Sequence, residues 1–136
     1  MKIIYLANIR LPTEKAHGLQ IMKMCEAFAK LGHQVELVVP ARRNLIKRNP
    51  FDFYGVKKTF KITRLPVLDL VGLVPRWGFA AEFWIFFLVA KIFLLFRRRD
   101  LLYTREPFLA LGGGRYILEL HSLPQKKGFF YRRALS

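Results

Sequence analysis

The pattern of apolar and polar positions in the first forty residues predicts a strand, a helix and a second strand. Residues 2–7 (KIIYLA) form a short, mostly apolar run with two isoleucines and a tyrosine, as is typical of a strand. Residues 18–31 change to a helical period, with polar positions three to four residues apart. Gly32 is placed to end this helix, and residues 34–39 predict the next strand, which Pro40 ends. A crossover helix between two neighbouring strands requires them to be parallel, so the chain opens with a βαβ unit.

Later apolar runs predict three more strands, at residues 59–65, 100–104 and 115–120. The segment between the second and third strands, residues 41–58, is basic and rich in turn residues, and it predicts a loop with one helical turn. Residues 108–111 allow one further helical turn before a glycine triplet.

These elements predict an α/β fold: a Rossmann-like parallel sheet of about five strands with flanking helices. The predicted domain covers residues 1–124. The remaining basic, aromatic tail, residues 125–136, has no helix-ending signal and is interpreted as the truncated start of a further element.

The most unusual segment is residues 77–96, which are apolar apart from Glu82 and Lys91 and are followed by three arginines. Twenty residues are enough to cross a bilayer. The apolar side chains contribute roughly −4 to −7 kcal/mol to the free energy of insertion into a bilayer, and the two charges contribute roughly +5 to +7 kcal/mol. The sum is therefore near zero.

Three interpretations of this segment stay open. One is a helix buried on one face of the sheet. The second is a helix partly covered by the sheet that dips into the membrane surface with Trp84, while Arg97, Arg98 and Arg99 contact lipid head groups. The third is a transmembrane span, which is least favoured because the parallel sheet needs a crossover helix here.

Charge and composition indicate an anionic partner and exclude several classes of protein. The formal net charge is +15, from 24 basic and 9 acidic residues, which indicates an anionic partner. With 53% hydrophobic residues the chain is too apolar for a disordered basic tail. A single cysteine, Cys25, excludes a disulfide framework within the chain and fits a reducing compartment. The N-terminus lacks the long apolar core of a signal peptide. The three histidines have no metal-ligand spacing, so no metal site is predicted.

Candidate binding residues collect where the predicted strands end, and ligands of open parallel sheets bind beyond the carboxyl ends of the strands. They are Asn8, His17 and Gly18 after the first strand, Arg105 and Glu106 after the fourth, and His121 and Ser122 after the fifth. Gly18 opens the predicted helix, where free N–H groups and the helix dipole favour a phosphate. Simpler alternatives remain: a glycine that only starts a helix, a surface histidine at 17, a salt-bridged pair at 105–106 and a structural histidine at 121.

Two stretches resemble the N-terminal domain of retaining, family 4 glycosyltransferases of the GT-B fold. The first is AFAKLGHQVELVVP at residues 27–40, with its G-H-x-V turn, and the second is DLLYTREP at residues 100–107 followed by ILELH at residues 117–121. The resemblance implies that this half of the fold binds the acceptor and that a second domain binds most of a nucleotide-sugar. It further implies that Gly18, with His17 beside it, approaches the donor diphosphate and that His121 lies at the reaction centre.

The chain departs from the family pattern in three ways. His17 stands where the family often has the first of two glycines. The connection at residues 108–114 is shorter than the usual full helix, and the E-x7-E segment of the family's second domain is missing.

The resulting expectation is the acceptor-binding domain of a retaining glycosyltransferase, inactive alone, that is peripheral to the cytoplasmic face of the cell membrane. The acceptor would be membrane-associated or a polysaccharide precursor. The expected partners are a nucleotide-sugar, a glycan or lipid-linked acceptor, an anionic membrane surface and the missing C-terminal domain, with no cofactor besides the donor and no nucleic acid. Two alternatives are a basic α/β nucleic-acid-binding module and a small membrane protein that spans at residues 77–96.

Overall fold

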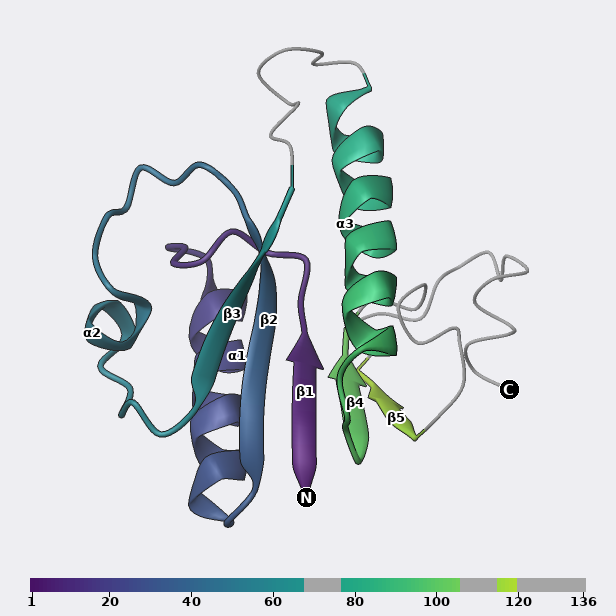
Figure 1. Ribbon diagram of the computed structural model, residues 1–136. Coiled ribbons are helices and arrows are strands. Elements are labelled where there is room, and N and C mark those ends of the chain that lie inside the picture. Colours follow the sequence, from purple (N-terminus) through teal and green to yellow (C-terminus); the bar gives the residue numbers. More distant parts are fainter. Residues whose placement is uncertain (68–76, 106–114, 120–136) are drawn as a thin grey trace.

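The computed structural model describes residues 1–67, 77–105 and 115–119. In chain order its elements are β1 (Lys2–Leu6), α1 (Ala16–Lys30), β2 (Gln34–Ala41), α2 (Pro50–Tyr54), β3 (Lys61–Pro66), α3 (Gly78–Leu95), β4 (Leu101–Thr104) and β5 (Tyr116–Leu118) (Figure 1). The helical turn predicted at residues 108–111 and the tail at residues 125–136 lie outside the described residues.

The five strands form one sheet in the order β3-β2-β1-β4-β5, and every pair of neighbours is parallel. This confirms the predicted α/β, Rossmann-like fold class. β1 is the central strand: Ile3 lies opposite Val35 of β2 on one side and Leu101 of β4 on the other. The strand order reverses at β1, so the carboxyl ends of β1 and β4 mark the topological switch point of the sheet, where ligands of such folds bind.

β1 is covered on both faces, because its side chains alternate between two separate hydrophobic clusters. Ile3, Tyr5 and Ala7 belong to the cluster that includes α1, whereas Ile4 and Leu6 belong to the cluster that includes α3. A strand buried on both faces needs apolar residues at nearly every position. This explains why the sequence shows a continuous apolar run here instead of alternation.

Helix α1 begins at Ala16, so the predicted start at Gly18 was wrong by two residues. Gly18 is buried in the first turn, and its N–H donates a hydrogen bond to the Lys15 carbonyl oxygen at 3.1 Å. A Cβ atom at this position would lie 2.3 Å from the Tyr54 hydroxyl oxygen and 2.6 Å from Thr13 Cγ2. The close approach of α2 therefore gives a packing reason for a glycine here.

Helix α3 lies within the apolar segment predicted at residues 77–96, with Trp77 and Phe96 at its cap positions. Every fourth residue faces the sheet, and the buried members of this row are Gly78, Glu82, Phe86, Ala90 and Leu94. The structure thus shows a helix whose one face is covered by the sheet, which fits the first two interpretations, and contact of its outer face with a membrane surface stays a prediction. Among the described residues, no helix has the length and apolar character needed to cross a membrane.

Strand β2 runs through Pro40 to Ala41, although Pro40 was predicted to end it. The register explains the difference: β1 ends opposite Val38, and beyond that point β2 pairs only with β3, where Pro40 lies opposite Leu65. Pro40 therefore sits at a local sheet edge, where a missing N–H interrupts no ladder.

We expect Gly18→Ala to destabilise the chain, although alanine normally favours a helix over glycine by about 1 kcal/mol. Forcing a methyl group against Tyr54 and Thr13 should cost about 1–3 kcal/mol of unfolding free energy, measured by urea denaturation. The same substitution in a Tyr54→Phe/Thr13→Ser background, which removes the two nearest atoms, should cost less. A Gly18→Ala variant that is as stable as the parent would contradict the packing explanation.

Candidate functional site

Polar side chains gather at the carboxyl edge of the sheet, around the switch point between β1 and β4. They come from the residues that follow the strands, from the first turns of α1 and from the first turns of α3. They form two networks, one on each face of the sheet.

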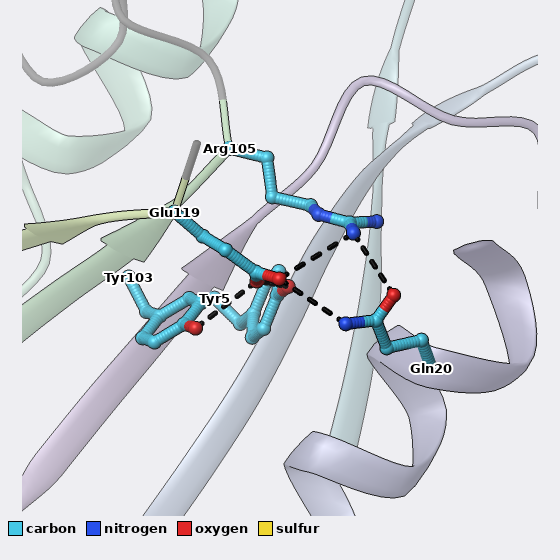
Figure 2. Close-up of polar contacts among 5 residues, drawn as sticks. All are labelled: Tyr5, Gln20, Tyr103, Arg105 and Glu119. Carbon is cyan, nitrogen blue, oxygen red and sulfur yellow. Dashed lines mark hydrogen bonds and ion pairs between the residues drawn. The ribbon is translucent and has the colours of Figure 1, made fainter. Parts of the chain in front are cut away.

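The first network centres on the carboxylate of Glu119, which directly follows β5 (Figure 2). The Tyr103 hydroxyl donates to its Oε2 at 3.0 Å, the Tyr5 hydroxyl to the same atom at 3.5 Å, and the Gln20 amide to its Oε1 at 3.1 Å. The Arg105 guanidinium lies 3.5 Å from Oε1 and also donates to the Gln20 amide oxygen at 3.1 Å. We call these five residues the Glu119 network; it joins β1, β4 and β5 to α1.

Burial and the neighbouring carboxylate keep both tyrosines of this network in the neutral form. Burial, together with the hydrogen bond to Glu119, raises the pKa of Tyr103 to about 12. Burial and the charge of Glu119 also raise the pKa of Tyr5. The two rings pack with centroids 4.6 Å apart. Near neutral pH the phenols therefore act as fixed donors that hold the carboxylate in one orientation.

The second network lies on the opposite face, where α3 covers the sheet. Arg42, which follows β2, donates to the Asn8 amide oxygen at 2.6 Å, and its Nε lies 3.5 Å from Glu82 Oε2 on α3. The Glu82 side chain is only 2% exposed and that of Arg42 only 15%. This Arg42 network, made of Asn8, Arg42 and Glu82, holds the start of the loop after β1 against α3.

The loop between β1 and α1 is held by hydrogen bonds to its backbone. The Arg64 guanidinium donates to the Leu11 carbonyl oxygen at 2.9 Å, and the Asn44 amide donates to that of Pro12 at 2.6 Å. The Tyr54 hydroxyl accepts from the Thr13 N–H and donates to the Thr13 carbonyl oxygen, both at 2.7 Å. The loop between β1 and α1 is therefore fixed by contacts from β3, α2 and the loop after β2.

The structure brings some of the predicted site residues together. Asn8 and Arg105 belong to the two networks, whereas His17 and Gly18 lie in the first turn of α1. The N–H of Gly18 is already used within the helix, and its role in phosphate binding stays a prediction. The other three predicted residues, Glu106, His121 and Ser122, lie outside the described residues.

The residues predicted to contact a membrane all lie at α3. Trp84 is exposed on the side of the helix away from the sheet, and Arg97, Arg98 and Arg99 follow the C-terminus of the helix. This end of α3 lies at the amino edge of the sheet, away from the two networks (Figure 1).

Sequence reasoning missed most members of the two networks: Tyr5, Gln20, Arg42, Glu82, Tyr103 and Glu119. Two of them carried a usable signal. Glu82 is the single acid in a helix that is apolar apart from Glu82 and Lys91, and Glu119 is an acid close to the carboxyl end of the last predicted strand. An acid in such a place usually has a buried cationic partner.

Together the two networks provide neutral amides, guanidinium groups and carboxylates at the carboxyl edge of the sheet. Amide and carboxylate groups suit the hydroxyls of a sugar, which both donate and accept hydrogen bonds, and guanidinium groups suit phosphate oxygens. In residues 1–67, 77–105 and 115–119, no three His, Cys, Asp or Glu side chains are grouped as metal ligands would be.

We expect Glu82→Ala to destabilise the chain by about 3–5 kcal/mol, because removing one partner of a buried ion pair leaves the other charge in a poorly solvated place. Replacing both partners with apolar residues of similar size, as in Glu82→Leu/Arg42→Met, should cost much less. Urea unfolding of the single and double variants measures this coupling. Equal losses in both would show that the ion pair contributes nothing.

The comparisons with known proteins support the fold. No protein-family model matches the chain, and no curated protein is significantly similar to it. Among solved structures, the glycosyltransferase apo UGT2 of Phytolacca americana is similar, with a TM-score of 0.50 and 12% sequence identity over 81% of this chain and 25% of that chain. The chain thus spans about a quarter of the length of that structure. At this identity the likeness concerns the fold alone: the chain has a Rossmann-like α/β fold similar to that of part of a glycosyltransferase.

Proposed function

We propose that this chain is the acceptor-side, N-terminal domain of a retaining glycosyltransferase. The observation that supports the proposal most directly is the pair of polar networks that flank the switch point of a β3-β2-β1-β4-β5 sheet. Ligand sites of doubly wound sheets lie at this point, and the chemistry of the networks suits hydroxyls and phosphates. The resemblance of residues 27–40 and 100–107 to the same family supports it independently.

In this proposal one set of residues binds the acceptor and another set binds the donor. Asn8, Arg105, Glu106 and Ser122 bind hydroxyls of a glycan or a lipid-linked acceptor. Gly18 and His17 approach the donor diphosphate at the start of α1, where the helix dipole favours negative charge. A second domain binds most of the nucleotide-sugar.

His121 is the proposed catalytic residue at the reaction centre. It follows Glu119 by two positions in the sequence, and the Glu119 side chain lies at the carboxyl edge of the sheet, where it accepts from Tyr103. A histidine there would donate a hydrogen bond to a phosphate or sugar oxygen as charge develops in the transition state.

A domain with half of the donor site should bind its acceptor but should not transfer a sugar. We expect the 136-residue chain to transfer no sugar from UDP-glucose or GDP-mannose to water or to a glycan. In ¹H–¹⁵N NMR spectra, a lipid-linked saccharide with a short prenyl chain should shift the amides of Asn8, Gln20 and Arg105. Turnover by the chain alone would contradict the division into two domains. Shifts confined to the amino edge of the sheet would contradict the site.

In a protein that joins this chain to its second domain, we expect His121→Ala to lower kcat about a hundredfold to a thousandfold. This is the usual effect of removing a positioned donor from a developing charge. The melting temperature should change little. His33→Ala is the matched control, because His33 lies at the amino edge, with Nδ1 3.2 Å from the N-terminal amine. Near-normal turnover in His121→Ala would remove this residue from the reaction centre.

A further inference from the structure

Helix α3 presents an apolar face on the side away from the sheet. Four large apolar side chains lie there at intervals of four, four and three residues: Trp84, Leu88, Ile92 and Leu95, which are 54%, 61%, 49% and 81% exposed. We call this row the outer stripe. A helix that covers a sheet normally turns polar residues outward. The stripe continues at both ends of the helix with Trp77 and Phe96, which are 69% and 84% exposed.

An open, basic hollow of about 610 Å³ lies directly beyond the C-terminal end of the stripe. Its lining comprises five basic residues and one acid: Lys2, Arg97, Arg98, Arg99, Asp100 and Arg115. The acid is partly engaged, since Asp100 Oδ2 accepts a hydrogen bond from the backbone N–H of Lys2 at 2.7 Å. The hollow therefore carries an excess of positive charge.

The five cations of this basic hollow differ in their other contacts. Arg97 pairs with Glu36 on β2, and the Arg99 guanidinium donates to the Leu94 carbonyl oxygen at 3.1 Å, so both hold the end of α3 in place. Arg98 and Arg115 are exposed and line the hollow from two different segments. These two arginines are the ones whose removal should leave the fold intact.

We propose that the outer stripe and the basic hollow form one surface that docks onto an anionic lipid bilayer. The stripe lies along the boundary between head groups and acyl chains, and the hollow receives lipid phosphates. A helix of 18 residues is about 27 Å long, so the stripe can lie flat in this boundary region. Trp77 at the start of the face and Trp84 in its middle are both exposed, and tryptophan is enriched at the membrane–water interface, which is this same depth.

The combination of charge and apolar area favours a bilayer over other partners. A nucleic acid would use the arginines but leave the stripe in water. A protein partner would bury the stripe but would also need a set of acids to match the basic hollow at its end, and protein interfaces are depleted in Asp and Glu. Only an anionic bilayer offers apolar chains and phosphates side by side over this length. The docking does not depend on the proposed sugar transfer.

The test is co-sedimentation of the 136-residue chain with vesicles of phosphatidylcholine alone and of phosphatidylcholine mixed with phosphatidylglycerol. We expect strong binding to the mixed vesicles only, and weaker binding at high salt. The Trp77→Phe variant keeps Trp84 as its single tryptophan. Its fluorescence should be quenched by lipids brominated in the acyl chains.

Two pairs of variants separate the parts of the surface. Arg98→Gln/Arg115→Gln should weaken binding about thirtyfold, since each basic residue near an anionic surface contributes about fivefold. Arg43→Gln/Lys47→Gln, with the same charge change on an exposed loop, should bind nearly as the parent does. In the Trp77→Phe variant, the further change Leu88→Gln/Ile92→Gln should abolish the quenching of Trp84 by brominated lipids. Leu31→Gln/Leu45→Gln, at exposed positions away from α3, should leave this quenching unchanged.

Several results would overturn the proposal. One is the absence of binding to mixed vesicles by the parent chain, which needs no variant to interpret. A second is equally weakened vesicle binding in Arg98→Gln/Arg115→Gln and in its control, which would show that net charge alone explains the attraction. A third is tighter binding to RNA than to mixed vesicles. A fourth is self-association that is lost in Leu88→Gln/Ile92→Gln, in a chain that does not bind vesicles. Competition by free inorganic phosphate at millimolar concentration would assign the hollow to a soluble anion.

Discussion

The structure depends on one constraint: β1 is enclosed on both faces, and each face needs its own cover. Alternate side chains of the strand enter two separate clusters, Tyr5 towards α1 and Leu6 towards α3. The second cluster cannot form unless the chain crosses to the other face of the sheet after β3, because α3 supplies part of it. After that crossing β4 pairs with the second edge of β1, and the strand order reverses there, which marks the carboxyl ends of β1 and β4 as the place where ligands of such sheets bind.

The two polar networks have similar roles on opposite faces of the sheet. Each one ties a residue beyond the end of a strand to the helix that covers that face: Arg105 to α1 through Gln20, and Arg42 to α3 through Glu82. The carboxyl edge of the sheet is consequently held by both layers of helix. A ligand that binds there meets groups whose orientation is already fixed, which reduces the ordering cost of binding.

The sequence was informative where structure depends on local pattern. Apolar runs predicted all five strands, and the length of the apolar segment predicted α3. The ends of elements were less accurate, because the start of α1 depends on α2 packing against Gly18 and the end of β2 depends on its pairing with β3 alone. Most of the candidate site could not be predicted, because its partners are far apart: Gln20 and Glu119 are 99 positions from each other in the chain.

The central position of β1 has a consequence for folding during synthesis. Ile3 lies opposite Val35 on one side but opposite Leu101 on the other, so the second edge of β1 finds its partner only after the chain has been made as far as β4. Until then a buried, apolar strand has an open row of backbone donors and acceptors, which is the kind of edge that pairs with other chains. Contacts of such long sequence separation also slow folding, because the loop must close before any contact stabilises it. The strand at the centre of the native sheet is therefore the one most in need of protection from pairing with other chains during synthesis.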